Sequence, residues 1–169
     1  MLSKTETVSD LFGYAIELER ASEALYLKLG AMFTQHSEVE RFWKRYAEEE
    51  AGHASYLERV RATVDPARLA GPADRDMLLM VRRCLKQTAQ ANLKDVKTLD
   101  DAHQLATELE NSETNTVFEF MIMSFSTDEL AKSQPFLRTQ LNTHVARLDK
   151  DFPSGYRERI ARQNVKAGK

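Results

Sequence analysis

Glutamate and histidine residues occur in this sequence at spacings that suit metal binding. Glu50 and His53 form a Glu-x-x-His pair, and Glu110 and Glu113 are spaced likewise. On a helix, side chains three residues apart share one face within about one turn, so each pair can contact a single ion. Iron, zinc and manganese accept carboxylate oxygens and neutral imidazole nitrogens as ligands. The two pairs therefore predict metal-binding chemistry.

The same residues interrupt the apolar faces of four predicted helices. Residues at alternating spacings of three and four turn inward in a helical bundle. Each such stripe is apolar at one or both ends and polar near its middle. The acidic and histidine members of the four stripes are Glu19, Glu50, His53, His103, Glu110, Glu113 and His144. Because His103 lies two turns before Glu110, we expect its imidazole to be hydrogen-bonded within the protein or exposed to solvent, rather than to bind a metal.

Buried carboxylates need a compensating charge. Burying one without a partner costs several kcal/mol or raises its pKa, and converging carboxylates also repel one another. No Lys or Arg occupies an inward position from which it could pair with the four glutamates. Two divalent ions would balance the four charges, and two histidines would add nitrogen ligands. The candidate metal ligands are therefore Glu19, Glu50, His53, Glu110, Glu113 and His144.

Neighbouring residues are expected to have ordinary structural roles. Glu48 and Glu49 lie beside Glu50 in the sequence, and we expect both to be solvated. Tyr26 and Tyr46 lie on inward stripes, where packing in the core is the expected role.

Four long helices and one long connection must position the candidate ligands. The abundance of Ala, Leu, Glu, Arg and Lys, without runs of alternating β-branched residues, favours helices. The expected long helices cover residues 6–31, 37–63, 98–123 and 135–151. Residues 64–97 form a crossover that contains a further helix at 75–95. Because the other connections are short, this predicts an all-α, ferritin-like four-helix bundle rather than a simple up-and-down one.

Local signals support these boundaries. Ser37 with Glu40 predicts a capping box, Thr98 or Asp100 can cap the third helix, and Pro135 suits the first turn of the fourth. The length favours one domain over residues 1–169, with 157–169 as a C-terminal tail.

On these residues the chain resembles the rubrerythrins and other ferritin-like di-iron carboxylate proteins. The segments that carry the resemblance are ELERASEALY, AEEEAGHASYL, ELENSE and LNTHVARL. The resemblance implies that Glu19 is a terminal ligand, that Glu50 bridges two irons, and that His53 binds the first iron. It further implies that Glu110 and Glu113 are the paired carboxylates of rubrerythrins. His144 resembles the nitrogen ligand of the second iron.

The resemblance also implies an activity, namely peroxide reduction or ferrous oxidation in oxidative-stress defence at a di-iron centre. The chain has one cysteine, Cys84, so no Cys-x-x-Cys pair and no rubredoxin domain accompany the expected centre. An external electron donor would therefore have to supply the electrons.

The fourth helix departs from the family pattern. A Glu-x-x-His motif is expected there, but Leu141 occupies the position of the second bridging carboxylate. Two alternatives therefore stay open beside the redox enzyme. One is a non-catalytic protein that binds a single zinc or iron ion, through Glu19, Glu50 and His53 or through Glu110, Glu113 and His144. The other is a metal-free helical bundle that acts through its surface.

Composition narrows the expected partners and compartment. With 24 basic and 26 acidic side chains, the net charge of −2 gives no general attraction for nucleic acid or anionic lipid. The longest apolar runs are about five residues, too short to span a membrane, and the N-terminal residues lack a signal-peptide core. We therefore expect a cytoplasmic protein. Aromatic residues predicted at its edges favour a homodimer: Phe42, Trp43, Phe118 and Phe120.

Overall fold

The computed structural model describes residues 5–112, 114–153 and 155. The described residues form helices and no strand, so the fold is all-α as predicted. The helices are α1 (Val8–Met32), α2 (Ser37–Thr63), α3 (Pro66–Ala70), α4 (Arg75–Ala89), the short 3₁₀ helix η1 (Leu93–Asp95), α5 (Leu99–Glu110), α6 (Thr114–Phe125), α7 (Asp128–Ala131) and α8 (Gln134–Asp151). Glu113 and the predicted tail at 157–169 lie outside the described residues.

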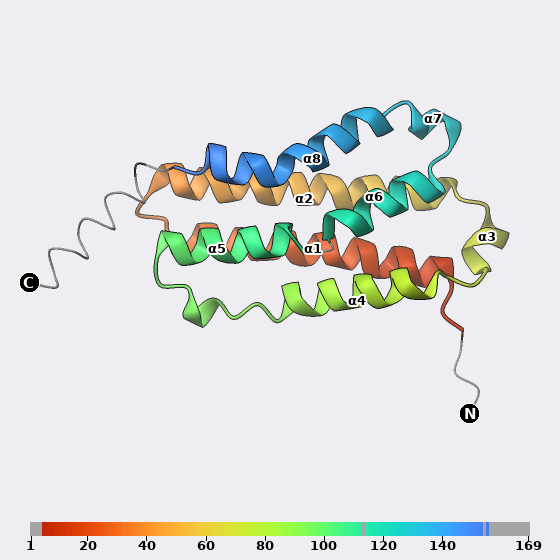
Figure 1. Ribbon diagram of the computed structural model, residues 1–169, viewed down its shortest axis with the longest axis horizontal. Coiled ribbons are helices and arrows are strands. Elements are labelled where there is room, and N and C mark those ends of the chain that lie inside the picture. Colours follow the sequence, from red (N-terminus) through yellow and green to blue (C-terminus); the bar gives the residue numbers. More distant parts are fainter. Residues whose placement is uncertain (1–4, 113, 154, 156–169) are drawn as a thin grey trace, which may run out of the picture.

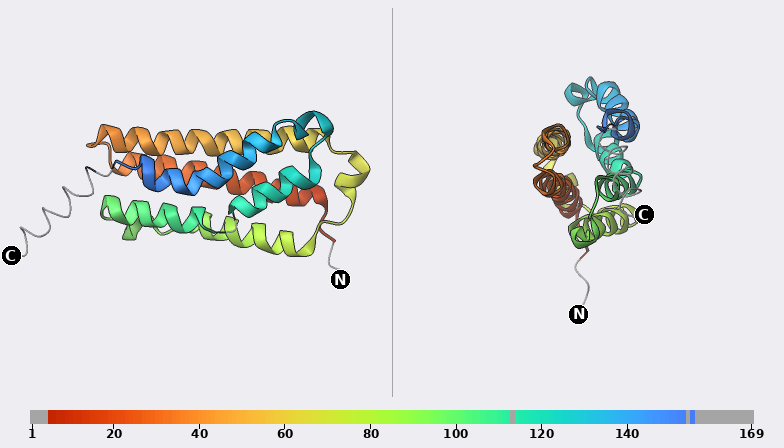
Figure 2. Two further views of the ribbon diagram at one scale, coloured as in Figure 1. Left: turned by 45° about the horizontal axis from the view of Figure 1, so that its top comes forward. Right: turned by 90° about the vertical axis from the view of Figure 1, so that its left-hand side faces the viewer.

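The long helices run along one common axis (Figure 1). Viewed down that axis, α1 and α2 form one side of the molecule, and α5, α6 and α8 form the other (Figure 2). Helix α4 belongs to the predicted crossover at 64–97 and packs alongside α1. The predicted helix at 75–95 ends earlier, at Ala89, and η1 follows it.

The interior consists of two apolar clusters separated by a polar layer. One cluster includes Phe12, Leu57 and Phe118. The other includes Trp43 and Leu148. Along α1, residues 8–18 contribute to the first cluster and residues 26–29 to the second, and the acidic interruption of the stripe lies between them. The inward stripe of α1 therefore has the predicted arrangement, with apolar residues toward its two ends and an acidic residue near its middle.

The predicted third helix at 98–123 is divided in two. Helix α5 ends at Glu110, and α6 begins at Thr114. The Asn111 N–H bonds the Thr107 carbonyl, but the Ser112 N–H turns to the nearer Leu109 carbonyl, and the Ser112 hydroxyl bonds that same carbonyl. Ser and Asn offer such local bonds in competition with the helical ladder. The break leaves Glu110 as the last residue of α5.

The start of α5 provides a test of the local structure. The Thr98 hydroxyl accepts from the Asp101 N–H at 3.1 Å, and the Asp101 carboxylate accepts from the Thr98 N–H at 2.8 Å. The capping box predicted at Ser37 is wrong, because His36 holds the N-cap position of α2 and Ser37 is already helical. We expect Thr98→Ala to lower the unfolding free energy by about 1 kcal/mol and Ser37→Ala to leave it nearly unchanged. Urea unfolding measures both, and equal losses would contradict this account.

The aromatic residues expected at a dimer edge are largely internal. Phe42, Trp43 and Phe118 are buried, and Phe120 is partly buried against the same core. The predicted aromatic dimer surface is therefore wrong for these residues, and the homodimer stays a prediction without an assigned surface. In the part of the chain that the structure describes, no helix is both long and apolar enough to cross a membrane.

Candidate metal centre

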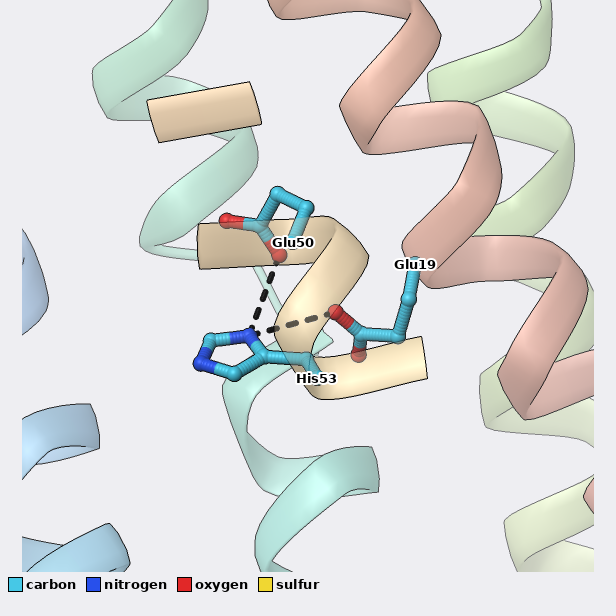
Figure 3. A group of neighbouring side chains, drawn as sticks. All are labelled: Glu19, Glu50 and His53. Carbon is cyan, nitrogen blue, oxygen red and sulfur yellow. Dashed lines mark hydrogen bonds and ion pairs between the residues drawn. The ribbon is translucent and has the colours of Figure 1, made fainter. Parts of the chain in front are cut away.

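Two groups of acidic and histidine side chains meet in the polar layer. Glu19 of α1 lies with Glu50 and His53 of α2 (Figure 3). Glu50 also lies with Glu110 of α5 and His144 of α8. Within each group the candidate ligand atoms are all within 4.8 Å of one another, so each group could hold a metal ion. We call them the hairpin group, because α1 and α2 supply all of it, and the inter-half group.

Glu50 belongs to both groups and presents a different oxygen to each. Its Oε2 lies 3.2 Å from His53 Nδ1, and its Oε1 lies 3.3 Å from His144 Nε2. The remaining carboxylates are similarly close, with Glu19 Oε2 3.4 Å from His53 Nδ1 and Glu110 Oε1 3.2 Å from His144 Nε2. Around an ion with ligands at about 2.0–2.2 Å, neighbouring ligand atoms lie about 2.8–3.6 Å apart. The four distances therefore lie within the range expected for atoms that share an ion, in each of the two groups.

Burial and mutual charge shift the protonation of the hairpin group. Burial raises the pKa of Glu19 from 4.5 to about 8. Burial alone would lower the pKa of His53, but the Glu50 and Glu19 carboxylates raise it from 6.5 to about 10. Burial alone would raise the pKa of Glu50, but the two imidazoles bring it below its usual value. Burial alone would also lower the pKa of His144, but Glu110 and the other carboxylates around it raise it. Without a metal, protons on the two imidazoles therefore supply the positive charge of the centre.

Two buried atoms of the centre lack a satisfying hydrogen bond. Glu19 Oε2 and His144 Nε2 are shielded from solvent, and within the described residues neither makes a hydrogen bond of ordinary geometry. Both face ionisable neighbours at 3.2–3.4 Å. An unsatisfied buried polar group is costly. A cation in each group would satisfy the unbonded atom of that group, so the residues present fit metal binding.

Glu49 was expected to be solvated, and this expectation is wrong. Its Oε2 lies 3.2 Å from His144 Nδ1, on the opposite side of the ring from the inter-half group. Arg147 holds the same carboxylate, with 2.7 Å between Nη2 and Oε1. Glu48 is exposed as predicted. The sequence carries no local signal for the contact of Glu49, because its partners lie on α8.

Tyr26 has a polar partner as well as a packing role. Its hydroxyl donates a hydrogen bond to Glu110, and burial together with that carboxylate raises its pKa well above the usual value. Its ring stacks on Trp43 with centroids 5.8 Å apart and planes 9° from parallel. Tyr26 therefore ties the inter-half group to one of the apolar clusters.

The structure brings five of the six predicted ligands together, and Glu113 lies outside the described residues. Leu141 is buried in the apolar cluster with Phe118, so the position expected for a fourth-helix carboxylate is apolar. His103 takes no part in either group, and its Nε2 lies 3.0 Å from Asp149.

Comparisons of the chain with protein-family models, with curated proteins and with solved structures found no match. The geometry described above, rather than a relative, therefore supports the functional argument.

Proposed function

We propose that this chain is a ferritin-like protein of the rubrerythrin type that holds two iron ions and uses them to reduce peroxide or to oxidise ferrous iron. The observation that carries the proposal is the position of Glu50, whose two oxygens face two separate imidazoles at 3.2 and 3.3 Å. One carboxylate with a ligand set on each side is what a two-ion centre requires.

Iron held by these groups would supply electrons to peroxide or dioxygen. The chain's own residues would bind and shield the reacting atoms. Each group offers three ligands, which leaves coordination positions for a small oxidant. The His53 ring lies against Phe118 with centroids 4.5 Å apart, and apolar clusters flank the centre on both sides, so the centre is largely shielded from bulk water. The Tyr26 hydroxyl keeps its proton directed at Glu110.

A second candidate is a non-catalytic protein that binds one zinc or iron ion. The observation that favours it is that α1 and α2 alone supply the hairpin group, whereas α8 has Leu141 in place of a carboxylate. A metal-free bundle is a third candidate, because protonated imidazoles would also satisfy the carboxylates around them.

Metal content separates the three candidates. We expect protein purified without oxygen and titrated with iron(II) to bind two ions per chain, measured by plasma mass spectrometry. Peroxide should then oxidise two irons for each molecule consumed, because its reduction to water takes two electrons. The exposed variant Glu48→Gln is the matched control and should bind the same amount. One ion per chain would favour the binding protein. No bound ion, with stability unaffected by iron, would overturn the proposal in favour of the metal-free bundle.

A further inference from the structure

The two groups differ in what lies behind their imidazoles. His144 presents Nε2 to Glu50 and Glu110, while its Nδ1 lies 3.2 Å from Glu49. His53 presents Nδ1 to its group, and its ring is backed by Phe118. Over the described ranges, no hydrogen bond or ion pair is seen at His53 Nε2. Among the described residues, therefore, a polar side chain orients the histidine of the inter-half group but not that of the hairpin group.

Glu49 is itself fixed by α8. Arg147 contacts both of its oxygens, at 2.7 Å from Nη2 to Oε1 and 3.4 Å from Nη1 to Oε2. Arg147 also lies 3.5 Å from Asp151, one turn further along the same helix. A guanidinium that contacts both oxygens of a carboxylate fixes its plane as well as its position. The acceptor that faces His144 is therefore held in place before any ion arrives.

This arrangement determines which nitrogen of His144 carries the proton in the neutral ring. A carboxylate held by Arg147 only accepts hydrogen bonds, so Nδ1 must donate to Glu49. The lone pair of the neutral ring is then at Nε2, the atom that faces Glu50 and Glu110. Metal-binding histidines generally use such an outer carboxylate, and its loss costs about 10–100-fold in metal affinity.

Glu110 has an outer partner too, because the Tyr26 hydroxyl donates to it. Among the described residues, Glu19 has no comparable outer partner: its carboxylate interacts with His53 and Glu50, which belong to the same group, and its Oε2 lacks a hydrogen bond of ordinary geometry. Two ligands of the inter-half group are thus oriented from outside. The ligands that belong to the hairpin group alone are not.

We infer that Glu49 and Arg147 are positioning residues that make the inter-half group the tighter of the two sites, so that divalent ions fill it before the hairpin group. This inference rests on the proposed two-ion centre and adds an order of filling to it. It assigns Glu49 and Arg147 no contact with the metal.

Cobalt(II) titration, followed by visible absorption and calorimetry, tests the order. The wild-type chain should bind two ions in resolved steps. Glu19→Gln should keep the tighter step, and Glu110→Gln should keep only the weaker one. Loss of the tighter step in Glu19→Gln, or two steps of equal affinity, would overturn the order. A wild-type chain that binds no cobalt would instead count against the two-ion centre itself.

Two adjacent alanine variants test the role of Glu49. Glu49→Ala should weaken the tighter step about 10–100-fold and leave the weaker step unchanged. Glu48→Ala removes the same charge from the neighbouring exposed position and should change neither step. Arg147→Gln keeps the Glu49 carboxylate but releases it, and should weaken the tighter step by less. Equal behaviour of the two alanine variants would overturn the assignment.

A spectroscopic measurement separates orientation from folding. Nitrogen-15 NMR of the zinc-loaded wild-type chain should show His144 protonated at Nδ1 and bound through Nε2. In Glu49→Ala the Nδ1 proton should exchange faster with solvent, while the helical circular dichroism stays the same. A His144 proton unaffected by Glu49→Ala would contradict the positioning role, whatever the affinity.

Discussion

Glu50→Gln will abolish tight binding at both sites, whereas Glu19→Gln and Glu110→Gln will each remove one ion. The reason is the shared position of Glu50, which faces His53 with one oxygen and His144 with the other. A neutral amide cannot bridge two cations, and its nitrogen would face one of the imidazoles. We expect affinity at each site to fall by more than the roughly 10–100-fold caused by losing an outer partner.

Metal stoichiometry after dialysis against a limited iron(II) or zinc(II) concentration measures this result. The expected values are none bound for Glu50→Gln, one for each single-group variant, and two for the wild type and Glu48→Gln. A Glu50→Gln chain that still holds one ion would mean that the two groups bind independently, and the bridging role would be wrong.

The benefit of metal to stability will grow as the pH rises. In the metal-free chain, Glu19 has a pKa of about 8 and His53 a pKa of about 10, both above their ordinary values. The folded state therefore holds these protons more tightly than the unfolded state. The unfolded chain releases the Glu19 proton above about pH 4.5 and the His53 proton above about pH 6.5, so metal-free stability falls as the pH rises toward 8 and 10.

Bound metal ions prevent this fall in stability at high pH, because they supply the positive charge that protons supply in the metal-free chain. Metal binding requires ionised carboxylates and neutral imidazoles, so affinity rises with pH and protons are released on binding. When the free metal concentration is about 100 times the dissociation constant, each bound ion adds about 2.7 kcal/mol to the free energy of unfolding. Two such ions would raise the melting temperature by about 10–20 °C in a chain of this size.

Thermal unfolding at pH 6, 7.5 and 9, with zinc(II) or with chelator, measures the effect. The difference between the two melting temperatures should widen from pH 6 to pH 9. Glu19→Gln removes one of the groups whose pKa is raised in the folded chain, so the stability of its metal-free form should depend less on pH between 4.5 and 8. A chelated wild-type chain as stable at pH 9 as at pH 6 would contradict the pKa values assigned to the centre.

Helical periodicity was sufficient to find most of the centre, because a buried helix face repeats every three to four residues. That spacing placed Glu19, Glu50, Glu110 and His144 on inward faces, and all four are buried. The central position of the charges could be predicted for the same reason, since apolar residues precede and follow them on each stripe.

The contacts of Glu49 could not be predicted in this way. Glu49 precedes Glu50 and so points about 100° away from it around α2. Its role depends on where α8 carries His144 and Arg147, which no local pattern encodes. The break after Glu110 is not predicted for a different reason: the spacing of three and four residues between inward positions continues across Asn111 and Ser112. Both residues nevertheless form local bonds that can end a helix.

Helices α1 and α2 together supply every ligand of the hairpin group, and this affects the order in which the centre forms during folding. The two helices are joined by a short turn, so the hairpin group requires only contacts between neighbouring segments. The inter-half group must wait until α5 and α8 dock from the second half of the chain. Contacts between nearby segments form faster than distant ones. We therefore expect the two groups to form during folding in the reverse of the order in which we propose that metal ions fill them.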